Sequence, residues 1–576
     1  MAVGATAPEW ATNAQSGKRS IVIFAASKSS RQSLGFICHH GPKFKACSLS
    51  LNGCGRQGLA QHPAIPVVII ETRTLPSVAS PALAMDALNS AVSHLISQPP
   101  LSTSGIIRLQ VAIEEQIEAI DWLHSQPELL LPRCFFSGRA TQPSLGNGHS
   151  SMSMASEHKL VSVAGVGSAI YFRQPHPFSY DDWLSIKRFL SERCPLIRAY
   201  GAIRFNPKAK VSPEWLPFGS FYFVIPQVEF DELEGTSMIA ATIAWDNALS
   251  WSWENAVNAL RATLRKVSSF IVKFPKQAPR TSIIISHNIP SKVEWDLAVN
   301  RALQMIQKNH SLLTKVVLAR STRVVPTADI DPLSWLASLQ VEGAGAYQFF
   351  LQPSDAPAFI GNTPEQLFHR KWLHITSEAL AGTRARGATT ALDHQIELYL
   401  LSSPKEDMEF AIVRETIRSK LEHSSEQAVC ENVLMKPSKA IRKLPRIQHL
   451  FAQLAGRLRS EEDEFEILSS LHPSPAVCGF PTEEARILIA ETEVFDRGMY
   501  AGPVGWFGGG ESEFAVGIRS ALVEKDMGAW IYAGTGIVEG SNPYLEWDEL
   551  ELKTSQFTKL LKLDLPHRQK VDVYEH

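Results

Sequence analysis

The second half of the chain alternates strand-like and helix-like segments joined by short turns, from residue 291 to about residue 563. Ser291 can cap a helix whose apolar residues recur near the helical period, and the β-branched segment Val316–Arg323 after it predicts a strand. Helices of this kind need large sheets on which to bury their apolar faces. The alternation therefore predicts two or three large sheets with helices outside them.

Residues 500–533 predict an antiparallel meander. A strand ends at Phe507, three glycines form a turn at 508–510, a second strand covers Phe514–Val523, and a third begins at Trp530. Strands joined by such short turns pair antiparallel. We therefore expect an α+β fold.

The chain begins with a basic leader. Residues 1–70 hold seven Lys or Arg and one acid, a net charge of +6, so the rest of this chain of net charge -2 carries -8. A basic, Ser-rich and acid-poor leader is typical of an organelle transit peptide. A disordered tail without a targeting role is the alternative, and the apolar run Ile21–Phe24 is too short for a secretory signal.

The segment after the leader carries little readable chemistry, and we interpret it as scaffold. Leu160–Phe172 and Gly219–Phe230 predict strands, residues 251–268 predict a helix, and the Ser/Gly-rich residues 137–157 predict a surface loop. The expected division is a leader (1–70), the N-terminal part of the scaffold (71–290), a catalytic region (291–565) and a tail (566–576).

The composition excludes several classes of protein. A chain of 576 residues with 44% hydrophobic and 20% charged residues is globular rather than disordered. No run approaches the roughly 18 apolar residues of a membrane-spanning helix, and a net charge of -2 provides no basic surface for nucleic acid or anionic lipid. Seven cysteines without a CxxC pair indicate thiols in a reducing compartment.

Two glutamate pairs share one local pattern. Ser403 can cap a helix with Pro404 at its first position, which puts Glu406 and Glu409 one turn apart at the helix start. An unpaired carboxylate on an interior face is costly, and a hard divalent cation such as Mg²⁺ can compensate it. Taken alone, Glu406 is better explained as the acid of a capping box with Ser403.

The second pair repeats the pattern at Asn542–Pro543, with Glu546 and Glu549 one turn apart. Glu549 shares a helical stripe with Leu545 and Leu552, which is expected to face the interior. Taken alone, Glu546 is better explained as an acid that the helix dipole favours in the first turn.

Lys315 has two interpretations, whereas Glu365 has one. Strand alternation puts Lys315 on one face with Val317, either as an end-of-strand residue reaching water or as a buried amine whose pKa falls from about 10.4 and makes it a usable base. Glu365 follows Pro364, which predicts a helix start and a surface acid.

Glycines and one arginine form the last group of candidates. Gly534–Gly536 ends a strand without a nucleotide-binding pattern, and its amides could hold a carboxylate. Arg519 alternates with Gly517 and Ala521 in the expected strand, as a partner for a substrate carboxylate or as one half of a sheet-edge ion pair.

Read together, seven blocks resemble the chorismate-utilising enzymes, and most closely the plastid isochorismate synthases of plants. The blocks are Lys315–Arg320, Phe359–Leu367, Glu378–Arg384, Ser403–Glu409, Leu471–Gly479, Tyr500–Gly505 and Ala533–Ile537. The resemblance implies large, mostly antiparallel sheets packed as a sandwich with helices outside, a fold shared with aminodeoxychorismate synthase.

The resemblance also implies a reaction, the Mg²⁺-dependent and reversible isomerisation of chorismate to isochorismate. The lysine matching Lys315 is the general base that activates water for attack at C2, and the acid matching Glu365 protonates the departing C4 hydroxyl. A base and an acid on opposite sides lower both barriers, each by about 10²–10⁴-fold.

The remaining site residues follow from the same resemblance. The acids matching Glu409 and Glu549 hold Mg²⁺, with those matching Glu406 and Glu546 beside them, and the ion binds the ring carboxylate of chorismate. The positions implied to bind the rest of the substrate are Tyr500 and Arg519 for the pyruvyl carboxylate, Gly382, Thr383, Gly534 and Gly536 for backbone contacts, and His472 for positioning near the ring.

Comparison within the family separates related activities. Anthranilate synthases carry Gln where Lys315 stands, and aminodeoxychorismate synthases carry a reactive Lys at the position of Ala381. Both differences favour water as the nucleophile. Salicylate synthases, which go on to eliminate pyruvate, share the base, the acid and the metal acids, so they remain the main alternative. A catalytically silent binding subunit would have lost one of these residues, and none is lost.

The resemblance finally implies a monomer in the plastid stroma, without a glutamine amidotransferase subunit. It further implies that the product feeds salicylate and phylloquinone synthesis.

Overall fold

The computed structural model describes residues 49–50, 66–139, 159–273, 281–308, 311–342, 345–424 and 427–563. Outside them lie the tail, most of the expected leader, and residues 140–157 of the predicted surface loop. In the part of the chain that is described, no helix is both long and apolar enough to cross a membrane.

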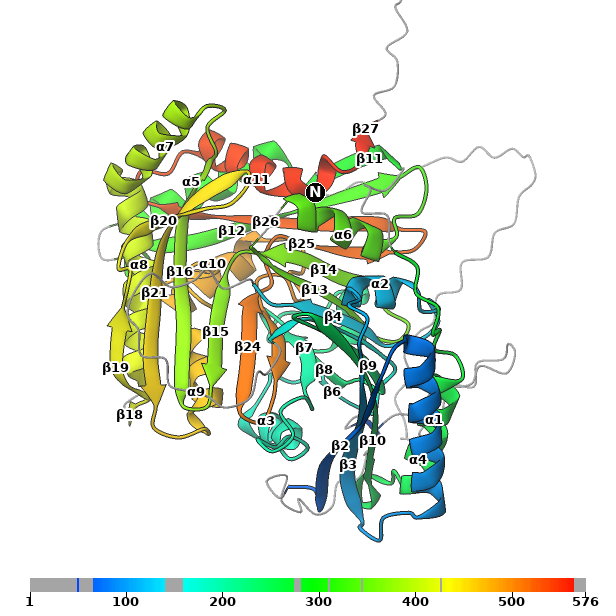
Figure 1. The fold of residues 1–576 in the computed structure, drawn as a ribbon. Coiled ribbons are helices and arrows are strands. Elements are labelled where there is room, and N and C mark those ends of the chain that lie inside the picture. The colour runs from blue at the N-terminus through cyan, green and yellow to red at the C-terminus, as the bar shows by residue number, and fades with distance from the viewer. Residues whose placement is uncertain are drawn as a thin grey trace, which may run out of the picture. The chain divides into compact units, whose positions relative to one another are not determined.

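Two large sheets organise the described residues (Figure 1). The 11-stranded sheet runs in the order β1 (Leu49–Ser50), β6 (Ile170–Gln174), β8 (Phe221–Ile225), β7 (Ala199–Ile203), β23 (Pro503–Phe507), β24 (Glu511–Val516), β15 (Gln366–Lys371), β16 (His374–Ala385), β21 (Ile447–Leu458) and β19 (Cys430–Met435), with β20 (Ala440–Lys443) also paired to β21. The 14-stranded sheet runs in the order β2 (Ile69–Val78), β3 (Ser104–Ile113), β10 (Thr236–Asp246), β9 (Val228–Leu233), β5 (Leu160–Val166), β4 (Arg133–Ser137), β13 (Tyr347–Gln352), β14 (Ala358–Thr363), β25 (Ser520–Glu524), β26 (Gly528–Val538), β12 (Lys315–Pro326), β11 (Ser282–Ile289) and β27 (Lys562–Leu563), with β22 (Gly479–Phe480) also paired to β12. All described pairings are antiparallel except β1 with β6, β2 with β3 and β11 with β27. The strands β17 (His423–Ser424) and β18 (Gln427–Ala428) pair with each other and form a separate two-stranded sheet.

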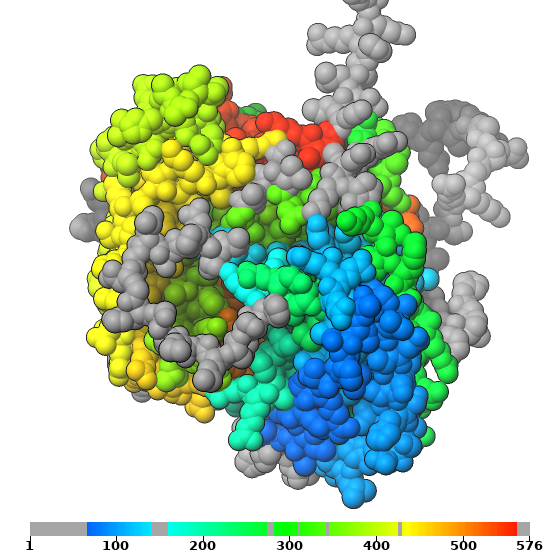
Figure 2. Space-filling model, viewed as in Figure 1, coloured from blue at the N-terminus to red at the C-terminus, as the bar shows by residue number. Residues whose placement is uncertain are grey.

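Helices cover the outer faces of these sheets. They are α1 (Pro81–Ser97), α2 (Ala119–His124), α3 (Tyr180–Lys187), α4 (Trp253–Leu264), α5 (Lys292–Gln307), α6 (Pro332–Glu342), α7 (Thr390–Ser402), α8 (Pro404–Glu422), α9 (Asp463–Leu471), α10 (Thr482–Thr492) and α11 (Pro543–Thr558). α1 and α4 pack on β3 and β10, α8 packs on β16, and α11 packs on β26. On the face shown in Figure 2, α1 forms the blue surface at the lower right and α7 the yellow-green surface at the upper left.

The two sheets pack face to face around one apolar core. Phe223 and Phe514 of the 11-stranded sheet share a buried cluster with Leu318, Phe359 and Tyr532 of the 14-stranded sheet. A second cluster lies between the other face of the 14-stranded sheet and its helices. The predicted α+β sandwich of mostly antiparallel sheets with helices outside is confirmed.

Both halves of the chain contribute to both sheets. β4 pairs with β13 across Phe135 and Phe350, and β7 pairs with β23 across Tyr200 and Trp506. The residues before and after 290 therefore share their sheets and their core.

The predicted meander is wrong in one respect, because its middle strand is two strands in different sheets. β24 belongs to the 11-stranded sheet and β25 to the 14-stranded sheet, and the chain crosses between them at Gly517–Arg519. Arg519 has a φ of 50°, which a continuous strand does not contain. Alternation could not reveal the crossing, because strands buried on both faces are apolar throughout.

A second crossing lies beside the first. The chain passes from β14 to β15 at Pro364–Glu365, so the helix predicted after Pro364 is wrong. Backbone hydrogen bonds join the two crossings, from Asn362 N to Arg519 O (3.0 Å) and from Val516 N to Glu365 O (3.0 Å). Together they bring Glu365 and Arg519 into the space between the sheets.

Candidate active site

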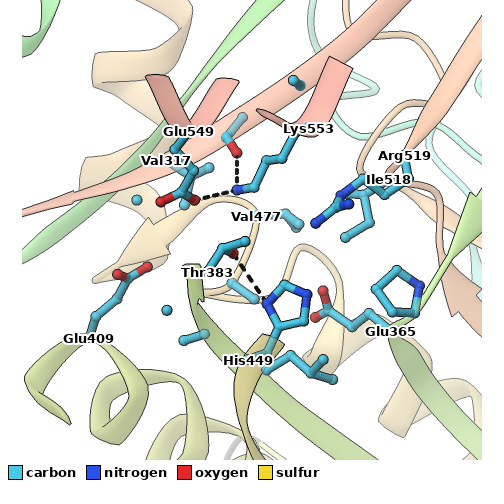
Figure 3. A pocket seen from close by; sticks show the side chains of 18 of the residues that line it. Val317, Glu365, Thr383, Glu409, His449, Val477, Ile518, Arg519, Glu549 and Lys553 are labelled. Carbon is cyan, nitrogen blue, oxygen red and sulfur yellow. Dashed lines mark hydrogen bonds and ion pairs between the residues drawn. The ribbon is translucent and has the colours of Figure 1, made fainter. Parts of the chain in front are cut away.

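A cavity opens where these crossings meet β12, β16, β21, β26 and the parts of α8 and α11 that follow their first turns. Nine of the predicted site residues line it: Glu365, Gly382, Thr383, Glu409, Tyr500, Arg519, Gly534, Gly536 and Glu549. Glu409 and Glu549 lie toward one end of the view in Figure 3, and Glu365 and Arg519 lie toward the other. The cavity therefore has a carboxylate end and a cationic end.

Lys315 stands directly behind the carboxylate end. Its side chain is 0% exposed, so the interpretation as an end-of-strand residue reaching water is wrong. Its Nζ lies 3.0 Å from Glu409 Oε1. A Cβ at Gly536 would lie 2.3 Å from Glu409 Oε1 and 2.9 Å from Lys315 Cε, so a side chain here would displace the ends of the lysine and the acid.

Glu365 is a buried acid rather than the predicted surface acid. Its side chain is 4% exposed between β14 and β15. Burial raises the pKa of its carboxyl to about 8, although the charge of Lys315 opposes the shift. Glu365 therefore holds a proton at neutral pH and can donate it.

Both acidic helices begin as predicted. The Ser403 side chain accepts a hydrogen bond from Glu406 N, and Asn542 accepts from Tyr544 N and Leu545 N. The predicted interior stripe of α11 is wrong, however, because Leu545 is 60% exposed and the buried residues are Glu546, Leu550, Thr554 and Phe557. Glu549 flanks this buried face and lines the cavity.

Four acids and four bases form the carboxylate end. We call Glu409 and Glu549, which line the cavity, the inner acids, and Glu406 and Glu546, which are buried behind them, the outer acids. The ion pairs are Glu409 with Lys315 (3.0 Å), Glu549 with Lys553 (2.6 Å), Glu406 with Arg384 (2.5 Å) and Glu546 with Lys405 (2.7 Å). Glu406 is thus bound to an arginine instead of closing a capping box, and Glu546 is 2% exposed instead of a solvated first-turn acid.

The two acids of α11 have pKa values that are shifted in opposite directions. Burial, and then the charge of Glu549, raises the pKa of Glu546. Burial also opposes ionisation of Glu549, but the adjacent ammonium of Lys553 outweighs it and lowers the pKa of that carboxyl. Glu549 is therefore the acid of α11 that is ready to bind a cation.

The inner acids fit a hard divalent cation. They come from two different helix starts, offer only carboxylate oxygens and face one cavity. Within the described residues, no three His, Cys, Asp or Glu side chains converge closely enough to hold a metal by themselves. Mg²⁺ commonly takes one or two protein carboxylates and fills its other positions with substrate oxygens and water, so this donor set suits it.

The cationic end holds Arg519 and Tyr500. Burial lowers the pKa of the Arg519 guanidinium to about 10, so it stays charged. The expected placement of Arg519 within a strand is wrong, since it lies at the crossing with a φ of 50°. The Tyr500 ring stacks on Tyr532 with centroids 5.3 Å apart, and a Cβ at Gly534 would lie 2.8 Å from Tyr500 Oη.

A bulge in β16 brings backbone into the cavity. The pairing with β21 shifts between Ala381 and Thr383, and Gly382 has a φ of 64°. A Cβ at Gly382 would lie 2.6 Å from Glu406 Oε2, so a side chain there would displace an outer acid. Gly382 and Thr383 therefore line the cavity as predicted.

Two residues of the cavity were missed. Lys553 donates to Gly534 O (2.7 Å) and pairs with Glu549, and its position four residues after Glu549 on one helix was a usable signal. His449 lies 3.2 Å from Thr383 Oγ1 through Nδ1 (Figure 3). Burial, and then Arg519, holds its pKa well below the ordinary value, so it presents a neutral imidazole.

His472 does not have the predicted place near the reacting centre. It is not among the residues that line the cavity, and its Nε2 lies 3.0 Å from Arg204 O. Burial lowers its pKa to about 4, and its ring meets Phe205 edge-on. His472 is a neutral core residue, and the histidine of the cavity is His449.

Known proteins resemble this chain over most of its length. Residues 103–562 match the family described as chorismate binding enzyme. The chain is 59% identical to the chloroplastic isochorismate synthase of Catharanthus roseus, over 93% of this chain and 94% of the relative, and 59% identical to the chloroplastic isochorismate synthase 2 of Arabidopsis thaliana, over 90% and 91%. The solved structure of MenF, the menaquinone-specific isochorismate synthase of Escherichia coli, aligns with a TM-score of 0.67 at 24% identity, over 83% of this chain and all of that one.

Proposed function

The chain belongs to the family of chorismate-binding enzymes, and we propose on that premise that it is an isomerase converting chorismate to isochorismate. Its plant relatives are named as chloroplastic enzymes, and these names agree with the predicted chloroplast location of this chain. The observation that carries the proposed chemistry is a buried lysine and a protonated glutamic acid at one cavity.

In the proposed reaction, Lys315 acts as the base in its neutral amine form, after giving up the proton of its ion pair with Glu409, and Glu365 acts as the acid. Lys315 takes a proton from water as the water oxygen bonds to C2 of the ring. The two ring double bonds shift, the C4–O bond breaks, and Glu365 supplies the proton with which the C4 hydroxyl leaves as water. One water enters and one leaves, so the reaction is an isomerisation and is reversible.

The proposed cofactor is Mg²⁺, held by the inner acids, Glu409 and Glu549. Its contribution would be to neutralise the ring carboxylate of chorismate, which otherwise meets these acids. Arg384 and Lys405 hold the outer acids on the far side from the cavity. This division is supported by the cavity lining, which includes the two inner acids and neither of the outer acids.

The pyruvyl carboxylate is proposed to bind at the cationic end. Arg519 is buried, charged and aimed into the cavity (Figure 3). Tyr500 lines the same cavity. A guanidinium can hold a carboxylate through two parallel hydrogen bonds, which a single amine cannot. The bulge of β16 at Gly382–Thr383 then contacts the ring through backbone groups, together with Gly534–Gly536, which lies within β26 instead of ending a strand as predicted.

We further propose that the enzyme acts as a monomer without a glutamine amidotransferase subunit, because water replaces ammonia as nucleophile. Ala381 supports this choice, since it lines the cavity where a lysine would mark an aminodeoxychorismate synthase. We also propose that the N-terminus is a transit peptide. The product is proposed to feed salicylate and phylloquinone synthesis.

The decisive experiment incubates purified protein with chorismate and Mg²⁺ and follows isochorismate and pyruvate together. Isochorismate without pyruvate is expected, and starting from isochorismate should return chorismate. The Glu365→Gln and Lys315→Gln variants serve as controls from the same preparation. Stoichiometric pyruvate would assign the salicylate synthase reaction instead, and no turnover of chorismate would refute the proposed function.

A further inference from the structure

The two outer acids are held differently from the two inner acids. The inner acids line the cavity and pair with Lys315 and Lys553, whereas the outer acids do not line it and pair with Arg384 and Lys405. The outer acids are also more deeply buried than the inner ones. The outer carboxylates are thus fixed by ion pairs that leave them out of the cavity lining.

Lys405 forms the clearest of these ion pairs. It lies in the first turn of α8, and its Nζ contacts Glu546 Oε1 on α11 at 2.7 Å. The other oxygen of the same carboxylate, Oε2, accepts from Thr535 Oγ1 on β26 at 2.6 Å. Both oxygens of Glu546 are therefore engaged by side chains of other elements.

The position of Lys405 matters because two acidic helix starts meet here. α8 brings Glu406 and Glu409, and α11 brings Glu546 and Glu549. In a buried site, a divalent cation responds to every charge within several ångströms, because the surroundings screen charge poorly. The ammonium of Lys405 cancels one negative charge of this group without occupying either inner acid.

We propose that Lys405 is a positioning residue that keeps Glu546 out of the metal coordination and thereby weakens the binding of free Mg²⁺ to the inner acids. The inference rests on the proposed function, in which Glu409 and Glu549 hold the ion. An ion held by two carboxylates exchanges more readily than one held by three, and it leaves coordination positions for the carboxylate of the substrate. Weak binding of the free ion is thus a property that Lys405 imposes on the site.

The test titrates substrate-free protein with Mg²⁺ by calorimetry. Lys405→Met should tighten Kd by about tenfold or more, because a positive charge is lost and Glu546 is released toward the ion. Lys405→Arg keeps the charge and should stay within about twofold of wild type. Lys439→Met is the matched control, since Lys439 pairs with Asp407 on the same helix at 2.6 Å but outside the cavity, and it should leave Kd unchanged.

A double variant separates charge from packing. Lys405→Met combined with Glu546→Gln replaces one neutral pair by another, so Kd should return to within about threefold of wild type. Thermal unfolding without Mg²⁺ checks the fold. Without the ion, the Lys405→Met variant should unfold at a lower temperature than wild type. Saturating Mg²⁺ should then raise its unfolding temperature by more than it raises that of wild type, because the ion binds the folded variant more tightly.

The outcomes distinguish this inference from the proposed function. An unchanged or weaker Kd in a folded Lys405→Met protein would overturn the role of Lys405 and leave the metal site standing. If wild type binds no Mg²⁺ with or without chorismate, the proposed metal role itself falls and this inference falls with it.

Discussion

Replacing Glu365 by glutamine should have opposite effects on activity and on stability. The side chain keeps its size, but it can no longer give a proton to the leaving hydroxyl. Loss of a general acid costs about 10²–10⁴-fold in kcat. The fold, by contrast, loses a group that is costly to ionise at 4% exposure.

The magnitude follows from the pKa of Glu365, which rises from 4.5 to about 8 in the folded protein. The unfolded chain releases this proton above about pH 4.5, whereas the folded chain keeps it until about pH 8. The folded state thus binds more protons within this window, and wild-type stability falls there as pH rises, by up to about 1.4 kcal/mol for each pH unit. Across the whole window the loss approaches about 5 kcal/mol, and above pH 8 it no longer grows.

The assay compares wild type and Glu365→Gln by denaturant unfolding at pH 5, 6, 7 and 8. All other titrating groups are shared, so the difference between the two proteins isolates Glu365. We expect the free energy of unfolding of the variant, relative to that of wild type, to rise steadily from pH 5 to pH 8. In parallel, wild-type kcat should fall above about pH 8 as Glu365 loses its proton. A stability difference that stays constant across this range would show that Glu365 ionises normally, and the assignment of the acid would fail.

Three further changes test the rest of the site. Lys315→Gln should leave the unfolding temperature within a few degrees but remove water addition, and wild-type turnover in this variant would refute the base. Glu549→Ala should abolish the dependence of turnover on Mg²⁺, and an unchanged metal titration would count against the inner acids. Gly536→Ala should cost roughly 1–3 kcal/mol of stability and most of the activity, because its Cβ would lie 2.3 Å from Glu409 Oε1; a fully active, stable variant would show that the strand moves freely.

Local sequence patterns predicted the elements that local physics decides. Ser403 and Asn542 cap their helices as expected, because a side-chain oxygen one turn before an apolar stripe satisfies free backbone amides wherever the helix lies. Ser291 caps its helix for the same reason, and the strand at Lys315 followed from its β-branched residues. The ordered blocks of the family located most of the cavity residues.

Tertiary structure alone decided which residues meet. The crossing at Gly517–Arg519 looks like continuous strand in sequence, because strands buried on both faces lose the alternation that would mark a sheet. The crossing at Pro364–Glu365 looks like a helix start, because proline is common at the first position of a helix. His449 and His472 are both buried histidines, and only the packing places the first in the cavity and the second against Arg204 O.

The sequence by itself determined that this chain forms a sandwich of antiparallel sheets with an acidic site at two helix starts. It did not determine the charge state of that site. The burial that raises the pKa of Glu365 and the pairing of each metal acid with its own base depend on residues that are far apart in the chain. Desolvation and ion pairing are properties of the assembled surroundings, so they exist only once both sheets have closed around the cavity.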